Sequence, residues 1–325
     1  MDKQRRFVNQ FMAGETVDQL FLVRQKDLRT TSNGQLYVAC TLADKTGHVP
    51  ARMWQVSEAI YNSIPAEGFI QVKGRTELYK GALQLVIDAL RPWPAEKVNL
   101  ADFLATTPQD IDKMWAEVVE ILAAVKDKPL KALIKKFMED HALVERFKRS
   151  PAAAQLHHAY IGGLLEHTLG VLRAAKALLP LYPKLNADLA LAGVFLHDIG
   201  KAEELTGGTT LSYSDRGGLV GHIAIAVVWV AQKAQAVGEE MGEPFPARTL
   251  DLVQHLILSH HGSYDFGAVK LPAIPEAFLL HHLDNLDAKV YMTLNAIEND
   301  PDPSASFTAY MRQLETRVHK KSGEL

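Results

Sequence analysis

A small all-β barrel followed by an all-α domain is the architecture that we predict for this chain. Its 325 residues exceed what one hydrophobic core usually organises. Short runs rich in β-branched and aromatic residues fill the chain up to Pro94, whereas apolar residues recur at helical spacing after residue 107. We therefore expect a first domain over residues 1–94, a linker over residues 95–107 and a helical domain over residues 108–325.

Five strands are expected in the first domain. Several of them alternate apolar and polar residues, and turn signals such as Asn33-Gly34 and Thr46-Gly47 separate them. The expected strands are Val17–Val23, Leu36–Leu42, His48–Trp54, Phe69–Glu77 and Leu83–Leu90. Five short strands in one small domain favour a closed barrel.

The segment from Leu36 to Gly47, followed by a strand that carries Arg52 and Trp54, resembles the central hairpin of OB-fold nucleic-acid-binding domains. In that fold, single strands bind by stacking bases on aromatic side chains over a basic groove. The aromatic and basic candidates for such contacts are Tyr37, Arg52, Trp54, Lys73, Arg75, Tyr79 and Lys80. Packing on the barrel surface is the alternative role for each aromatic residue.

Helices are expected from Thr107 to about residue 320. Thr107-Pro108-Gln109-Asp110 has the capping residue, the proline and the acidic first turn of a helix start. The expected helices are Met114–Val125, Leu130–Phe137, Gly163–Leu179, Ala187–His197, Ile223–Ala236, Thr249–His261 and Ala277–Asn295. Gly200 is expected to terminate the helix that ends at His197.

Composition limits the classes of function. The net charge is −3, with 12 Lys and Arg against 9 Asp and Glu in residues 1–94 and 23 against 29 in the remainder. A mildly basic first domain beside an acidic second one fits a binding module joined to a cation-loaded catalytic module, although ordinary scatter of surface charge explains the counts equally well. The single cysteine, Cys40, excludes intrachain disulfides and a thiolate cluster for zinc.

The longest apolar run, Ile223 to Ala231, is too short to span a membrane, and the first residues lack the apolar stretch of a signal peptide. We expect a cytoplasmic protein without membrane contacts.

Histidines concentrate in the second domain. Eleven of the thirteen lie between His141 and His282, and several adjoin an aspartate or another histidine. Imidazole and carboxylate ligands without thiolates suit Mn²⁺, Fe²⁺, Co²⁺ or Zn²⁺, and an aspartate between two groups of histidines can bridge two such ions. A single histidine such as His167 could be a hydrogen-bonded core residue. The whole group indicates a metal site.

Four of these residues match a known signature. His167, the dipeptide His197-Asp198 and Asp284 resemble the signature of the HD phosphohydrolase superfamily, a helical fold whose members use divalent metal to cleave phosphoester bonds. Residues 156–168, 258–262 and 281–289 resemble the YhaM-type branch. Its members join an OB-fold to an HD domain and act as Mn²⁺-dependent 3′-to-5′ exoribonucleases, some of which also degrade single-stranded DNA. The resemblance therefore implies a single-stranded RNA substrate, and family habit favours a homo-oligomer.

The resemblance also implies the metal ligands. The first metal would be held by His167, His197, Asp198 and Asp284. His222 and His260 would hold a second metal, with Asp198 as the bridge. His261 is the alternative to His260 or a phosphate contact, and Asp287 is the alternative to Asp284.

Three further residues are candidates for catalysis alongside Asp198. Lys201 follows Asp198 by three residues and could neutralise the scissile phosphate. His157 and His158 could bind phosphate or protonate the leaving group, with a structural role as the alternative. Two metals would activate a water for in-line attack on phosphorus, so no protein nucleophile is needed.

Other functions remain open at this point. A cyclic-dinucleotide phosphodiesterase of the HD-GYP type would carry Gly-Tyr-Pro, whereas Gly262-Ser263-Tyr264-Asp265-Phe266 follows the histidine pair here. A nucleotide or alarmone hydrolase would share the metal site but has no evident use for the barrel. A nucleic-acid-binding protein with incidental hydrolysis would use the barrel but has no need of the ligands.

Overall fold

The computed structural model describes residues 5–66, 68–79, 82–104, 106–153, 160–207, 211–298, 300, 302 and 304–321. The chain divides into two compact units: Met1–Thr106 with Gly207–Thr210, and Thr107–Thr206 with Leu211–Leu325. Among the described residues, no helix is both long and apolar enough for a membrane span.

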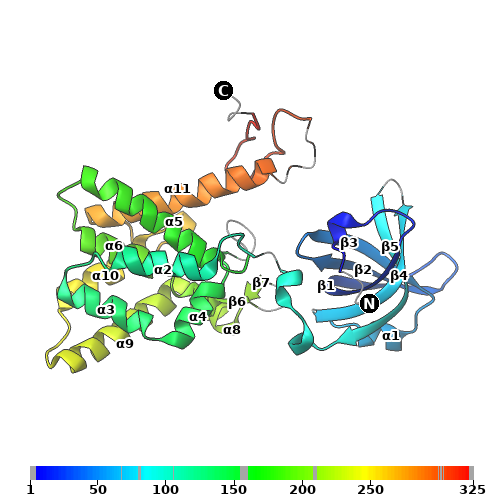
Figure 1. Ribbon diagram of the computed structural model, residues 1–325, viewed down its shortest axis with the longest axis horizontal. Helices are drawn as coiled ribbons and strands as arrows, with labels where there is room; N and C mark the ends of the chain where they lie inside the picture. Colours follow the sequence, from blue (N-terminus) through cyan, green and yellow to red (C-terminus); the bar gives the residue numbers. More distant parts are fainter. Residues whose placement is uncertain are drawn as a thin grey trace. The chain divides into compact units, whose positions relative to one another are not determined.

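The first unit is a closed five-stranded barrel (Figure 1). Its strands are β1 (Thr16–Thr30), β2 (Leu36–Asp44), β3 (Gly47–Trp54), β4 (Gly68–Tyr79) and β5 (Ala82–Trp93). They follow one another around the barrel in the order β1-β2-β3-β5-β4, with β3 and β5 parallel and the other neighbours antiparallel. The predicted all-β OB-fold barrel is confirmed.

Two features of the barrel differ from the expectation. Strand β1 continues past Val23 to Thr30, because a bulge at Val23/Gln25 lets it pair first with β4 and then with β2. Helix α1 (Glu58–Ser63) lies between β3 and β4 in the chain and was not predicted. Its first turn is capped by Ser57, whose hydroxyl accepts a hydrogen bond from the Ile60 amide.

The core of the barrel is apolar and includes the only cysteine. Phe21, Leu42, Ile70 and Leu85 are fully buried in it. Cys40 is buried beside them, and burial raises the pKa of its thiol to about 12. Cys40 is therefore a packing residue that offers no thiolate at neutral pH.

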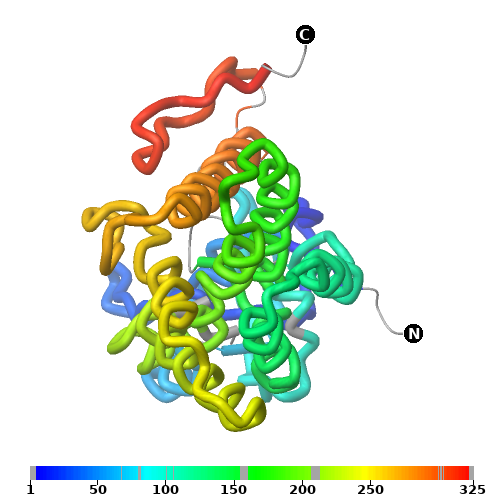
Figure 2. The backbone as a smooth tube through the Cα atoms, turned by 90° about the vertical axis from the view of Figure 1, so that its left-hand side faces the viewer, coloured from blue at the N-terminus to red at the C-terminus, as the bar shows by residue number. Residues whose placement is uncertain are grey.

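The second unit is helical, as predicted. Its helices are α2 (Ile111–Leu122), α3 (Lys128–Met138), α4 (His141–Arg149), α5 (Gly163–Leu178), α6 (Ala187–Leu196), α7 (Lys201–Glu204), α8 (Asp215–Val220), α9 (His222–Met241), α10 (Ala247–Ser259) and α11 (Pro275–Glu298). A small two-stranded sheet is formed by β6 (Leu205–Gly207) and β7 (Leu211–Tyr213). Helices α5 and α11 lie side by side in both views of the chain (Figures 1 and 2).

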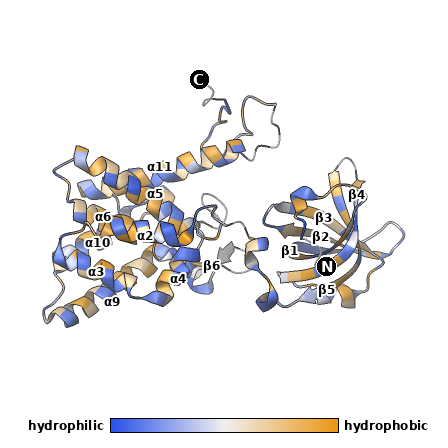
Figure 3. Cartoon of the chain, in the orientation of Figure 1, coloured by the Kyte–Doolittle hydropathy of each residue, from blue (hydrophilic) through white to orange (hydrophobic). Residues whose placement is uncertain are grey.

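Helix α6 is central, because every residue from Leu189 to Leu196 is buried. The outer helices α3 and α9 instead carry hydrophilic and hydrophobic residues side by side (Figure 3). The end of α6 therefore brings whatever follows it, beginning with His197, into the interior of the unit.

Both ends of the predicted helical region are corrected by the structure. Helix α2 is capped by the Asp110 side chain, three residues after the expected cap Thr107, whose hydroxyl accepts from the Gln109 amide. The chain was expected to remain helical to about residue 320, but α11 ends at Glu298. The described residues beyond it form irregular structure with isolated bridges Phe307–His319 and Met311–Thr316. Prolines at positions 301 and 303 of the sequence oppose a longer helix, since proline lacks the backbone N–H.

Candidate metal centre

Five helices deliver the predicted ligands to one place. Helix α5 carries His167 and α11 carries Asp284, while His197 and Asp198 follow the end of α6. His222 is the first residue of α9, and His260 directly follows α10. The side chains gather because the helices pack together: α5, α10 and α11 each contact α6, and α9 contacts α10.

The first group of ligand atoms comprises His167, His197 and Asp284, which all lie within 4.8 Å of one another. The Nε2 atom of His167 is 3.4 Å from Nε2 of His197 and 3.3 Å from Oδ1 of Asp284. Both imidazoles are fully buried. Two imidazole nitrogens and a carboxylate oxygen at this separation suit a divalent transition metal.

The second group comprises His222, His260 and His261, again within 4.8 Å. Burial, followed by the neighbouring His260, lowers the pKa of His261 to about 3. This imidazole is therefore neutral at physiological pH and keeps a lone pair for a cation. The sequence left His260 and His261 as alternatives, and the structure brings both to the same group.

Asp198 lies between the two groups. Its Oδ2 atom is 3.3 Å from Nε2 of His197, whereas its Oδ1 atom is 3.5 Å from Nε2 of both His222 and His260. Burial opposes the ionised form, but Lys201 and the histidines prevail and hold the pKa of Asp198 well below its usual range. An ionised carboxylate with one oxygen toward each group has the geometry of a bridging ligand.

The hydrogen bonding of the buried polar atoms also indicates that these residues fit a divalent metal. The buried atoms Asp198 Oδ1, His222 Nε2, His260 Nε2 and His261 Nδ1 have no hydrogen-bond partner among the described residues. Buried polar atoms normally have a hydrogen-bond partner. A cluster of four buried atoms without one, here called orphan atoms, therefore indicates that a ligand binds between them. The Asp198 carboxylate and the Nε2 atoms of His222 and His260, whose Nδ1 atoms bond elsewhere, offer electron pairs, so a cation is the ligand that fits them.

Hydrogen bonds on the far side of the rings fix their orientation. The Nδ1–H of His197 donates to the carbonyl of Val194 at 2.7 Å, and that of His260 donates to the carbonyl of Ile257 at 2.7 Å. Each bond places the remaining lone pair on Nε2, toward the cluster. The helix ends thus set the tautomers that a metal requires.

Asp287 contacts one of the candidate ligands, His167, from outside the cluster. Its Oδ2 atom accepts from Nδ1 of His167 at 2.7 Å, whereas Asp284 faces Nε2 of the same ring. Burial lowers the pKa of His167, but hydrogen bonds to Asp284 and Asp287 outweigh burial and raise it to about 10. A cation in the first group competes with the Nε2 proton, so metal binding at this group releases a proton.

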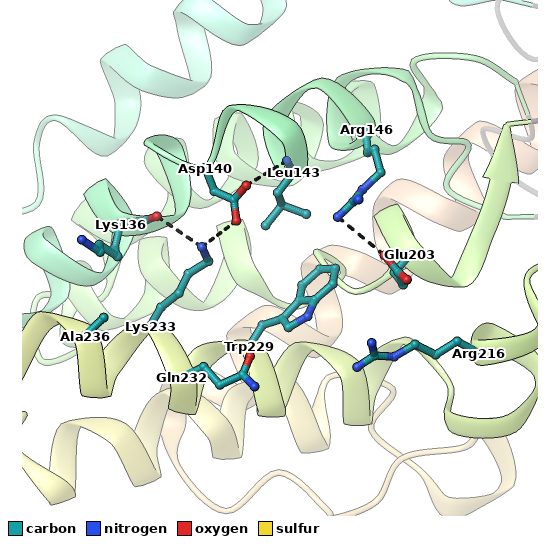
Figure 4. Close-up of a pocket in the computed structure, with 10 residues that line it drawn as sticks. All are labelled: Lys136, Asp140, Leu143, Arg146, Glu203, Arg216, Trp229, Gln232, Lys233 and Ala236. Atoms are coloured by element: carbon teal, nitrogen blue, oxygen red, sulfur yellow. Dashed lines mark hydrogen bonds and ion pairs between the residues drawn. The ribbon is translucent and has the colours of Figure 1, made fainter.

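Glu204 contacts the candidate metal centre, and the sequence did not reveal it. Its carboxylate accepts from Nδ1 of His222 at 3.0 Å and from the His222 backbone amide at 2.9 Å. The adjacent Glu203 points instead to Arg146, at 3.6 Å, in a separate pocket beside Trp229 (Figure 4). Of these two glutamates, Glu204 alone contacts the candidate metal centre, in the outer position that carboxylates often take behind metal-binding histidines.

Gly200 does not terminate the helix in the way that we expected. It has φ −64° and is the N-cap of α7, so it needs no left-handed conformation. Its role is close approach: a Cβ atom there would lie 2.1 Å from the carbonyl oxygen of His222. The glycine allows His222 to reach Asp198. Lys201 then begins α7, and its Nζ atom contacts Oδ2 of Asp198 at 2.7 Å.

A pocket of about 260 Å³ opens beside the metal centre. Its lining includes Lys201, His261 and Asp284, together with His281. The Nδ1–H of His281 donates to the carbonyl of His260 at 2.8 Å, in the space that a side chain at Gly262 would otherwise fill. A lining that includes candidate metal ligands and an ammonium group suits the pocket to a phosphate group.

The structure also brings four of the barrel candidates together. The Tyr37 and Trp54 rings, paired across β2 and β3, lie 4.8 Å apart between centroids. The Arg52 guanidinium lies 4.8 Å from the Tyr79 ring centroid and 5.7 Å from that of Trp54. Trp54 and Tyr79 are each more than two-fifths exposed. We call these four residues the aromatic face.

The other basic candidates are placed differently. Lys73 and Arg75 lie on β4 and form ion pairs with Asp18 at 3.5 Å and Asp88 at 2.9 Å. Both are well exposed, so these pairs are weak and can exchange for phosphate. The remaining predicted site residues, Lys80, His157 and His158, lie outside the described residues.

Comparisons with known proteins agree with this architecture. Residues 164–289 match the HD domain model. The chain is 35% identical over 312 residues to the 3′-5′ exoribonuclease YhaM of Geobacillus sp., covering 96% of this chain and 93% of that protein. It is also 35% identical to the protein of the same name from Bacillus subtilis, with 88% of each covered.

Solved structures similar to part of the chain include PriB from Ralstonia solanacearum, at 16% identity, a TM-score of 0.21 and coverage of 24% of this chain and 97% of that one. Another is the second OB-fold domain of replication protein A from Methanococcus maripaludis, at 15% identity, a TM-score of 0.22 and coverage of 27% and 92%. The identity to the YhaM proteins extends through both units. The chain therefore belongs to the YhaM family of 3′-5′ exoribonucleases.

Proposed function

We propose that this protein removes nucleotides one at a time from the 3′ end of single-stranded RNA, with two Mn²⁺ ions at the metal centre. The observation that carries the proposal is the position of Asp198, with one oxygen toward each group of histidines. Family membership supports the direction and the substrate. Single-stranded DNA is a second substrate, because stacking on the aromatic face does not depend on the sugar.

Each residue of the centre has a distinct part in this reaction. His167, His197 and Asp284 would hold one ion, the second group of histidines would hold the other, and Asp198 would bridge them. Bound ions of this kind supply an activated water and polarise the phosphate. Lys201 holds Asp198 in place, and because it also lines the pocket, its ammonium can contact a phosphate oxygen. His261 belongs to the second group, and its lowered pKa leaves it neutral at physiological pH, as a ligand must be.

The direction of degradation is tested with a 5′-labelled RNA and Mn²⁺. We expect a descending ladder of labelled products and the release of nucleoside 5′-monophosphates, while a blunt RNA duplex resists because its bases cannot reach the aromatic face. Gel electrophoresis of a time course and chromatography of the mononucleotides measure both results. Release of the labelled 5′ nucleotide as the sole early product would contradict the proposal.

The aromatic face is expected to hold the strand without taking part in the chemistry. Changing Tyr37→Ala together with Trp54→Ala should raise KM for a long single strand about 5- to 150-fold for each base stack lost, with kcat nearly unchanged. The matched control is Tyr182→Ala, which removes a tyrosine that is 55% exposed on the helical unit. Equal KM values for the double variant and the control would remove the aromatic face from substrate binding.

A further inference from the structure

We infer that the pocket beside the metal centre receives the 3′-terminal nucleotide of the strand and that Phe266 stacks on its base. This inference rests on the proposed function, since it states which part of the substrate the pocket holds. It assigns a substrate-positioning role to a side chain outside the metal centre. It also gives the strand a stacking position on the helical unit, separate from the aromatic face of the barrel.

The first observation is the position of Phe266. Its side chain is 74% exposed, yet it lines the same pocket as Lys201, His261 and Asp284. A single exposed apolar side chain is ordinary on a protein surface. An exposed phenyl ring at the wall of a pocket that also contains metal ligands offers a flat apolar surface where a nucleobase would arrive.

The second observation is that the ring stands on a tightly hydrogen-bonded turn, η5 (Tyr264–Phe266). The Phe266 amide donates to the carbonyl of Ser263 at 3.1 Å, and the Gly267 amide donates to that of Tyr264 at 3.0 Å. The Ser263 hydroxyl accepts from the Asp265 amide at 3.2 Å. A backbone that is already ordered loses little conformational entropy when a ligand binds.

The third observation is the distance to the metal centre. Gly267 has φ +87°, and a Cβ atom there would lie 3.6 Å from Nδ1 of His261. Gly267, the residue after Phe266, therefore lies close to His261 of the second group. Because Phe266, His261 and Asp284 line one pocket, a base stacked on Phe266 would have the phosphate of its own nucleotide in the pocket that these candidate ligands also line.

A positively charged side chain in the pocket also supports the inference that a nucleotide binds there. Lys289, on α11, lines the pocket and makes no ion pair with any described residue. It can therefore bind a backbone phosphate without giving up an existing partner. Stacking accepts any base and phosphate contacts carry no sequence information, so this subsite should accept all four terminal nucleotides.

The kinetic test uses the full chain with Mn²⁺ and two strands, one normal and one with an abasic 3′-terminal residue. Phe266→Ala should raise KM for the normal strand about 5- to 150-fold with kcat little changed. Phe266→Trp should restore KM, because it keeps a flat aromatic surface. Tyr264→Ala is the matched control, since Tyr264 is 62% exposed on the same turn but outside the pocket lining.

Removing the base should have the same effect as removing the ring. In the wild type and in Tyr264→Ala, the abasic strand should show the raised KM, whereas in Phe266→Ala the abasic and normal strands should be equivalent. An unchanged KM for the abasic strand in the wild type would overturn the inference. The inference would also be overturned if Phe266→Ala raised KM for the abasic strand by the same factor as for the normal strand, each relative to the wild type.

A binding measurement separates this inference from the proposed function. A strand that ends in 2-aminopurine at its 3′ position is titrated with the full chain without added metal, so that no hydrolysis occurs. Stacking on Phe266 should quench the fluorescence in the wild type and in Tyr264→Ala but not in Phe266→Ala. Equal quenching in all three would refute the subsite. An enzyme that quenches in this pattern yet releases no mononucleotides would leave the subsite standing and refute the exonuclease.

Discussion

Replacing Asp198 by alanine should abolish hydrolysis and remove the bridge between the two groups of histidines. Asp198 is the side chain with an oxygen toward each group, and it is only 2% exposed. Metal-assisted polarisation is worth several kcal/mol of transition-state stabilisation, so the rate should fall about 10³-fold or more. Isothermal titration with Mn²⁺ and RNA hydrolysis by the same sample measure the two effects together.

The control for this variant is Asp251→Ala, which removes an exposed carboxylate from α10, the helix that precedes His260. It should leave both metal binding and hydrolysis unchanged. Asp198→Asn adds a sharper comparison, because an amide keeps the shape of the side chain but cannot bridge two cations. Near-normal activity in the asparagine variant would rule out a bridging role for Asp198.

Gly200→Ala should damage the metal centre although residue 200 binds nothing. The added Cβ would lie 2.1 Å from the His222 carbonyl oxygen and 3.0 Å from its Cα atom, so the backbone of His222 must move. Forced overpacking of this kind costs about 1–3 kcal/mol of stability. Displacing a ligand by such a shift should weaken metal binding at the second group about 10- to 100-fold.

Gly218→Ala is the matched control for that change. Gly218 lies in α8, and a Cβ atom there would have no neighbour within 4 Å. Alanine should stabilise the helix by about 1 kcal/mol, since glycine is the poorer helix former. Thermal unfolding and Mn²⁺ titration of both variants check the prediction. Equal metal affinity in the two would show that His222 is not held by the contact at Gly200.

Long periodic segments were predictable from the sequence, and short ones were not. The five strands and helices such as α5 and α9 span enough residues for a repeating apolar pattern to emerge. Helices α1 and α8 have six residues each, which is less than two turns, so periodicity carries no signal. Their starts are set by local caps, the hydroxyls of Ser57 and Ser214.

The residues that gather at the candidate metal centre were predictable because their types and order resemble those of a known superfamily. The hydrogen bonds that other side chains make to these residues were not predictable. Glu204 supports His222, and Asp287 supports His167, through hydrogen bonds that exist only after helices distant in sequence have packed. Gly200 was misread for the same reason, since nothing near it in the chain shows that His222 will pack against it.

The orphan atoms of the candidate metal centre predict that the abundance of this protein depends on the supply of metal. Asp198 Oδ1, His222 Nε2 and His260 Nε2 are buried without hydrogen bonds to the described residues, which is unfavourable until a cation binds them. An ion that binds only the folded chain stabilises it by about 2.7 kcal/mol when its concentration is 100 times Kd. Where metal is scarce, a larger fraction of the chain is unfolded and open to proteases. Starvation for the metal should therefore reduce the number of molecules as well as the turnover of each one.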